Sequence, residues 1–170
     1  MDELGRLSPE DFKKMIKRPI IVILDDLRSM NNVGSIFRTS DAFAVEKIFL
    51  CGITAIPPHK EISKTALGAT ESVDWEYREN VVDAVKELQQ DGWKVFLVEQ
   101  TDYSISLEKF AISKDDKIAI VMGNEVFGVS DQLLPISDGC LEIPQFGTKH
   151  SLNVTNAAAI VLWEITRQML

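Results

Sequence analysis

Short runs of apolar residues alternate with amphipathic stretches along the chain. Uninterrupted apolar runs are typical of strands buried on both faces of a parallel sheet. The predicted strands cover 20–26, 47–50, 73–77, 95–98, 118–122 and 140–143. Apolar residues at helical spacing predict helices over 8–17, 61–67, 81–88 and 155–169, and a helix up to residue 43 that follows a turn at 31–34. A second turn is predicted at 68–70. This alternation predicts an α/β fold, a parallel sheet with helices on both faces.

The strand 118–122 stops at Gly123, which opens a polar loop that runs to Ser130. Ser130 is a good N-cap residue and predicts a further short helix over 131–134. Small molecules bind at the carboxyl ends of the strands in open parallel sheets, so the loop is a candidate site. Its glycine spacing matches neither a dinucleotide fingerprint nor a P-loop. Taken alone, the loop fits a tight turn equally well.

Polar residues follow three of the predicted strands, and they would meet at one edge of the sheet. The three clusters are Asn32 with Arg38, Asn124 with Glu125, and Ser151 with Asn153.

Each cluster also has an ordinary structural explanation. Asn32 or Ser151 would fit as a helix cap. Arg38 would fit as the partner of Asp41, and Glu125 as a solvated carboxylate. The residues alone leave these alternatives open.

Composition narrows the class of protein. With 170 residues and 45% hydrophobic content, the chain fits one domain over 1–170 with a short N-terminal helix at about 8–17. A net charge of −8 argues against a protein that coats nucleic acid through bulk positive charge. Cys51 and Cys140 are isolated, so we expect neither a disulfide nor a metal site. The longest aliphatic run, 20–24, is too short for a membrane span, and the start lacks a signal-peptide pattern, so we expect a cytoplasmic location.

Considered together, three motifs resemble those of the SpoU/TrmH class of SPOUT RNA methyltransferases. The motifs are Asn32 to Thr39, Val121 to Ser130, and Ile143-Pro144 with Ser151 to Val154, followed by an Ala-rich helix. They occur in the family's order, and the resemblance covers roughly residues 21–170.

The resemblance implies a homodimeric enzyme with a C-terminal trefoil knot that uses S-adenosylmethionine to methylate a ribose 2′-oxygen in RNA. By motif position, Arg38 would be the catalytic arginine and Asn32 its support. Glu125 would be the acid of the second motif, and Ser151 and Asn153 the polar pair of the third. The implied cofactor-binding residues are Glu99, Gly123, Asn124, Ile143 and Leu152.

Two questions stay open at this level. The family role makes Arg38 a base, but deprotonating a guanidinium is costly, so clamping the RNA phosphate is an alternative. The chain lacks the N-terminal RNA-binding domain of many relatives, and we expect tRNA as its substrate. The alternatives are ribosomal RNA and a role as a non-catalytic RNA-binding or assembly protein.

Overall fold

The computed structural model describes residues 7–149 and 151–170, and its strands form one seven-stranded sheet in the order β3-β2-β1-β6-β4-β7-β5. Every pair of neighbouring strands is parallel. The strands are β1 (Arg18–Asp25), β2 (Val45–Cys51), β3 (Asp74–Arg78), β4 (Lys94–Val98), β5 (Ile105–Ser106), β6 (Ile118–Met122) and β7 (Gly139–Glu142).

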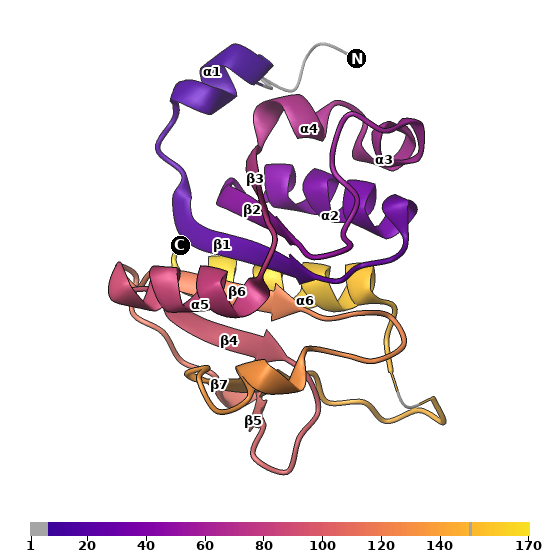
Figure 1. Cartoon of the computed structure of the whole chain (residues 1–170). Coiled ribbons are helices and arrows are strands. Elements are labelled where there is room, and N and C mark those ends of the chain that lie inside the picture. Colours follow the sequence, from indigo (N-terminus) through magenta and orange to yellow (C-terminus); the bar gives the residue numbers. More distant parts are fainter. Residues whose placement is uncertain (1–6, 150) are drawn as a thin grey trace.

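Helices cover both faces of this sheet, as Figure 1 shows. One face packs against α2, α3, α4 and α6, and the other against α5 and the 3-10 helix η2. The helices are α1 (Pro9–Lys14), α2 (Met30–Ala42), α3 (Lys60–Ala66), α4 (Ala69–Ser72), α5 (Val81–Gln90), α6 (Val154–Gln168), η1 (Leu107–Lys109) and η2 (Asp131–Leu133). The predicted parallel sheet with helices on both faces is confirmed.

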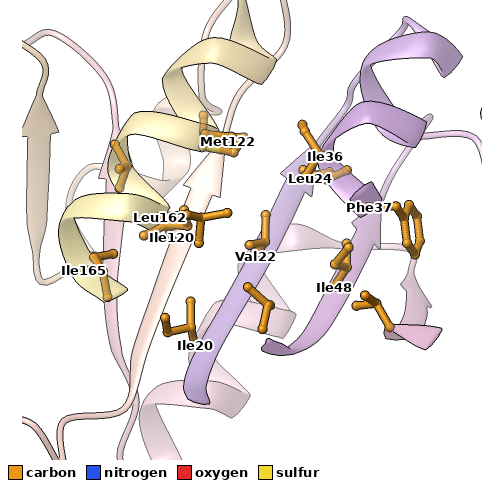
Figure 2. Close-up of a cluster of buried hydrophobic side chains, with 14 of the residues drawn as sticks. Ile20, Val22, Leu24, Ile36, Phe37, Ile48, Ile120, Met122, Leu162 and Ile165 are labelled. Carbon is orange, nitrogen blue, oxygen red and sulfur yellow. The ribbon is translucent and has the colours of Figure 1, made fainter. Parts of the chain in front are cut away.

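Strand β1 supplies both halves of the core because its side chains alternate between the two faces. Val22 and Leu24 point toward α2 and α6, whereas Ile21 and Ile23 belong to the cluster under α5. Figure 2 shows the first cluster, in which Leu162 of α6 packs near Ile120 of β6. Burial on both faces explains why the central strands are apolar without alternation.

The order of the strands determines where a ligand can bind. From β1 the chain moves outward to β2 and β3, and it later returns so that β6 lies between β1 and β4. The loops that follow β1 and β6 therefore leave neighbouring strands in different directions. A crevice at the carboxyl ends of the strands is expected at such a reversal.

The second helix begins earlier than the sequence predicted. We expected residues 31–34 to form a turn, but α2 starts at Met30, and Ser29 caps it by accepting a hydrogen bond from the backbone N–H of Asn32 at 3.3 Å. Gly34 therefore lies inside the helix. A Cβ at Gly34 would clash with the backbone oxygen of Ile62, so this glycine allows α2 and α3 to approach closely rather than making a turn.

Other local predictions were also wrong. The segment 131–134 forms only the 3-10 helix η2, and the Ser130 side chain does not cap it. The predicted turn at 68–70 forms the start of α4, and the predicted helix 8–17 ends at Lys14. Strand β5 was missed because two residues show no periodicity. No helix of the described residues is long and apolar enough to span a membrane.

Candidate functional site

A cavity of about 700 Å³ lies at the carboxyl ends of β4, β6 and β7. Its walls come from the loops that follow these strands and from the start of α6. Eight of the ten residues predicted from sequence line it, namely Glu99, Gly123, Asn124, Glu125, Ile143, Ser151, Leu152 and Asn153. Asn32 and Arg38 lie on α2, outside this lining.

A tight hairpin, Asn124–Gly128, forms one wall of the cavity. The backbones of these two residues exchange hydrogen bonds of 2.8 and 2.9 Å. The buried side chain of Asn124 accepts from the N–H groups of Val126 and Phe127, and it donates to the backbone oxygen of Asp26 at 2.7 Å. Asn124 therefore shapes the hairpin and joins it to the loop after β1.

Glycines and one carboxylate determine the shape of the same hairpin. A Cβ at Gly123 would clash with the backbone of Gly128 and Val129, where no side-chain movement could relieve it. Gly128 has a φ of +74°, and a Cβ there would clash with the carboxylate of Glu99. Glu99 accepts hydrogen bonds from the N–H groups of Val129 at 3.3 Å and Gln100 at 2.9 Å. The Glu99 carboxylate therefore supports the loop backbone.

Glu125 joins the hairpin to the first turn of α2. Its carboxylate accepts hydrogen bonds from the backbone N–H groups of Arg28 and Ser29, both at 3.0 Å, and from the Asn32 side chain at 2.9 Å. Burial alone would raise the pKa of Glu125, but these three donors outweigh it and lower the pKa below the ordinary 4.5. Glu125 is therefore held as an anion at the positive end of a helix. Asn32 does not cap its helix, because its side chain is bound to Glu125.

Arg38 lies two turns further along α2, and it is exposed. No hydrogen bond or ion pair joins its guanidinium to another of the described residues, and Asp41 instead accepts a hydrogen bond from Ser72. The pairing of Arg38 with Asp41 is therefore absent. An exposed guanidinium without such a partner is suited to binding an anion.

The third motif begins α6. Asn153 is the N-cap, and its side-chain oxygen accepts from the backbone N–H of Thr155 at 2.8 Å. Ser151, the alternative cap, is exposed and precedes the helix. Ile143 and Leu152 give the cavity an apolar wall on this side.

The sequence reading missed several polar residues of the cavity. Gln100 is the second residue after β4, and its side chain donates to Glu142, at the end of β7, at 2.9 Å. Thr101 and Gln145 also line the cavity. The rule that ligands bind at the carboxyl ends of strands applied to β4 and β7 as much as to β6, and it would have found all four residues.

The lowered pKa of Glu125 predicts a pH-dependent contribution to stability. Because the folded state favours the ionised carboxylate, this contribution is complete above pH 4.5 and is lost as the pH falls through the lower folded-state pKa. The free energy of unfolding of Glu125→Gln should lie below the wild-type value at neutral pH and converge with it in acid, as measured by urea unfolding. Glu108→Gln, at an exposed position in η1, is the control. An equal difference between Glu125→Gln and wild type at every pH would contradict the assigned role.

Comparison with known proteins places this geometry in a family. The SpoU rRNA Methylase family matches residues 19–163. The 23S rRNA (guanosine-2′-O-)-methyltransferase RlmB of Neisseria meningitidis is 32% identical over 150 residues, which cover 88% of this chain and 59% of that protein. A putative TrmH family tRNA/rRNA methyltransferase of Staphylococcus aureus is 30% identical over 148 residues, which cover 87% of this chain and 58% of that protein.

Solved structures agree with this match. The A. aeolicus TrmH/SpoU tRNA modifying enzyme superposes with a TM-score of 0.81 at 28% identity, covering 94% of this chain and 79% of that one. The AdoMet-bound rRNA methyltransferase of Sinorhizobium meliloti superposes with a TM-score of 0.82 at 27% identity, and the match covers 97% of this chain and 62% of that one. The chain spans about three fifths of the length of the two curated relatives. Since the family match includes all three motifs and most of the chain, the protein belongs to the SpoU rRNA methylase family.

Proposed function

We propose that this chain transfers a methyl group from S-adenosylmethionine to a ribose 2′-oxygen in RNA. The observation that carries the proposal is the tie between Glu125, at the cavity, and Asn32, on the helix that also bears the unengaged Arg38. Family membership and the names of the relatives support the reaction type.

The residues of the larger cavity fit S-adenosylmethionine. A volume of about 700 Å³ lies within the usual range for ligand pockets, roughly 300–1,000 Å³. Adenine needs an apolar slot, which Ile143, Leu152 and Ala157 would supply. Glu142 and Gln100 offer polar groups to the ribose and amino-acid parts of the cofactor. When bound, the cofactor supplies an electrophilic methyl group.

Within this proposal, Arg38 binds the RNA phosphate beside the reacting hydroxyl. Its guanidinium is exposed and without a partner among the described residues, as a phosphate clamp requires. A base role would require a guanidinium to give up a proton, which is costly for this group. Glu125 and Asn32 position the helix, while Ser151 and Asn153 line the side of the cavity from which α6 begins.

tRNA is the substrate we favour within this proposal. Support comes from the A. aeolicus tRNA modifying enzyme, because this chain covers 79% of its length. The N. meningitidis relative is a 23S rRNA enzyme, so ribosomal RNA is the competing substrate.

A homodimer belongs to the same proposal. Trp163 and Ile160 of α6 are 52% and 40% exposed, and the Trp163 ring lies 6.2 Å from the ring of Phe43. Such an apolar surface between two helices suits a second copy of the chain.

Sedimentation should show a dimer for wild type and a monomer for Trp163→Glu. Tyr103→Glu, which changes an exposed aromatic residue in the loop after β4, should remain dimeric; a monomeric wild type would refute the dimer.

The trefoil knot and the single domain over 1–170 complete the proposal. Support for the knot is the TM-score of about 0.8 with SpoU structures. An experimental structure would test the knot: tracing the chain should show segment 143–153 threaded through the loops that follow β4 and β6. The cytoplasmic location stays a prediction.

The direct test of the reaction uses labelled S-adenosylmethionine with pools of tRNA and rRNA. Wild type should label tRNA, and Arg38→Ala should lower the rate by about 100-fold or more because positioning of the ribose is lost. Cofactor binding should be unchanged, since Arg38 lies outside the lining of the cavity. If Arg38 is a clamp, the pH–rate profile should show no ionisation step between neutral and alkaline pH.

Arg167→Ala is the matched control for Arg38→Ala. Arg167 is exposed and lies about 20 Å along α6 from the cavity end of that helix. If wild type binds the cofactor but labels no RNA, the chain is a binding protein with this fold. If Arg38→Ala retains the wild-type rate, the role of Arg38 is wrong.

A further inference from the structure

A second cavity, of about 440 Å³, shares the hairpin wall with the first. Both cavities are lined by Asn124, Phe127, Gly128, Val129 and Asp131. The second is completed by residues whose side chains have no role in the proposed methyl transfer, namely Asp25, Asp26, Arg28, Ile53 and Ser130. A ligand there would lie next to whatever occupies the larger cavity.

Three aspartates line this second cavity, and each has at least one carboxylate oxygen to which no described residue donates a hydrogen bond. Asp25 is 4% exposed, and only its Oδ2 is engaged, by the N–H of Ser130 at 2.8 Å. Asp26 uses only Oδ1, which accepts from the N–H of Ile53 at 2.9 Å. No side-chain hydrogen bond from a described residue reaches Asp131, although it lines the cavity. None of these oxygens is sealed from solvent, so they are open to a ligand that offers N–H groups.

A metal ion does not explain these carboxylates. Within 7–149 and 151–170, no group of three His, Cys, Asp or Glu residues is arranged to hold one. Burial raises the pKa of Asp25, and the hydrogen bond from Ser130 only partly opposes it. An organic ligand with N–H groups can donate hydrogen bonds to the free carboxylate oxygens, and it needs no set of metal ligands to do so.

Two exposed apolar side chains stand at the same cavity. Phe127 is 84% exposed and Ile53 is 67% exposed. A phenyl ring held on a rigid hairpin in water offers a flat surface for stacking, and such aromatic surfaces hold splayed-out bases in RNA-binding proteins. The ligand should therefore be planar as well as rich in donors.

Arg28 adds a positive charge beside these groups. Its side chain is exposed and makes no ion pair within the described residues, while its backbone N–H is bound to Glu125. A guanidinium at the rim can bind a phosphate and offset the repulsion between the carboxylates and an RNA backbone. A ligand that has a planar ring, an edge of N–H donors and a phosphate is a nucleotide.

We propose that the second cavity binds a guanine base of the RNA substrate, stacked on Phe127 and paired with Asp131. Guanine presents N1–H and N2–H side by side, and they match the two unengaged oxygens of one carboxylate. The free Oδ1 of Asp25 is a further acceptor. Uracil has a single N–H between two carbonyl oxygens, which carboxylates would repel. This inference rests on the proposed function, since it identifies a nucleotide of that RNA.

The test is a titration of the 15N-labelled protein with guanosine 5′-monophosphate and with uridine 5′-monophosphate, followed by NMR. The guanosine nucleotide should shift the amide signals of Phe127 and Ser130 and bind at least about fivefold tighter than the uridine nucleotide. Because both carry the same phosphate and ribose, the difference reports on the base.

Variants locate the contacts. Phe127→Ala should weaken guanosine nucleotide binding at least about fivefold through lost stacking. Asp131→Asn should lower the preference for guanine over uracil by at least about fivefold and leave uridine nucleotide binding unchanged. The matched controls are Tyr103→Ala and Asp102→Asn, exposed residues that line neither cavity. The amide spectrum of each variant verifies its fold.

Equal affinity for the two nucleotides, absence of binding, or shifts confined to the wall formed by 143–153 would overturn the guanine site. The titration requires neither cofactor nor methyl transfer. A chain that binds guanosine nucleotide in this way but labels no RNA would refute the proposed reaction and retain the guanine site. A chain that labels RNA but does not bind the guanosine nucleotide in this way would refute only the guanine site.

Discussion

The Glu125 carboxylate is the contact on which the rest of the site depends. It joins a hairpin after β6 to the first turn of α2, elements more than 90 positions apart in sequence, through three hydrogen bonds. Two of these come from backbone N–H groups at a helix N-terminus, where an anion is favoured. The contact fixes how α2, and therefore Arg38, lies relative to the larger cavity.

This contact can act only if the hairpin itself is rigid. Asn124 uses its amide oxygen within the turn and its amide nitrogen toward the loop after β1. Gly123 and Gly128 permit backbone approaches that a Cβ would prevent, and Glu99 supports the outgoing strand of the hairpin. The resulting wall separates two cavities. One has an apolar side of the kind a nucleoside cofactor needs, and the other has carboxylates beside an exposed phenyl ring.

The sequence predicts the sheet well because buried strands leave a simple signal, uninterrupted apolar runs such as 118–122. It also identifies the edge of the sheet that carries the site, since the strands are parallel. The sequence does not predict which individual side chains contact one another. Nothing in the spacing indicates that Asn32 binds Glu125, because the contact depends on how distant elements pack.

Composition and spacing also mislead at particular residues. Gly34 suggested a turn but lies inside a helix against α3. The role of Asn124 toward the cofactor, which the family resemblance implied, stays a prediction: the residue lines the larger cavity, and its side chain is bonded within the hairpin and to Asp26. Asp25 ends a buried strand and gave no signal that it would line a cavity. Such functions of single side chains depend on tertiary packing, which local sequence patterns do not encode.

The central claim is that Glu125 and Asn32 act as one unit in positioning α2, the helix that bears Arg38. A double-mutant cycle on the rate of RNA methyl transfer, using Asn32→Ala, Glu125→Ala and the combined variant, tests it most directly. Each single change should slow transfer, and the combined variant should be no slower than the slower single one, a coupling of about 1 kcal/mol or more. Effects that add to within about 0.5 kcal/mol would show that the two residues act independently and would contradict the account.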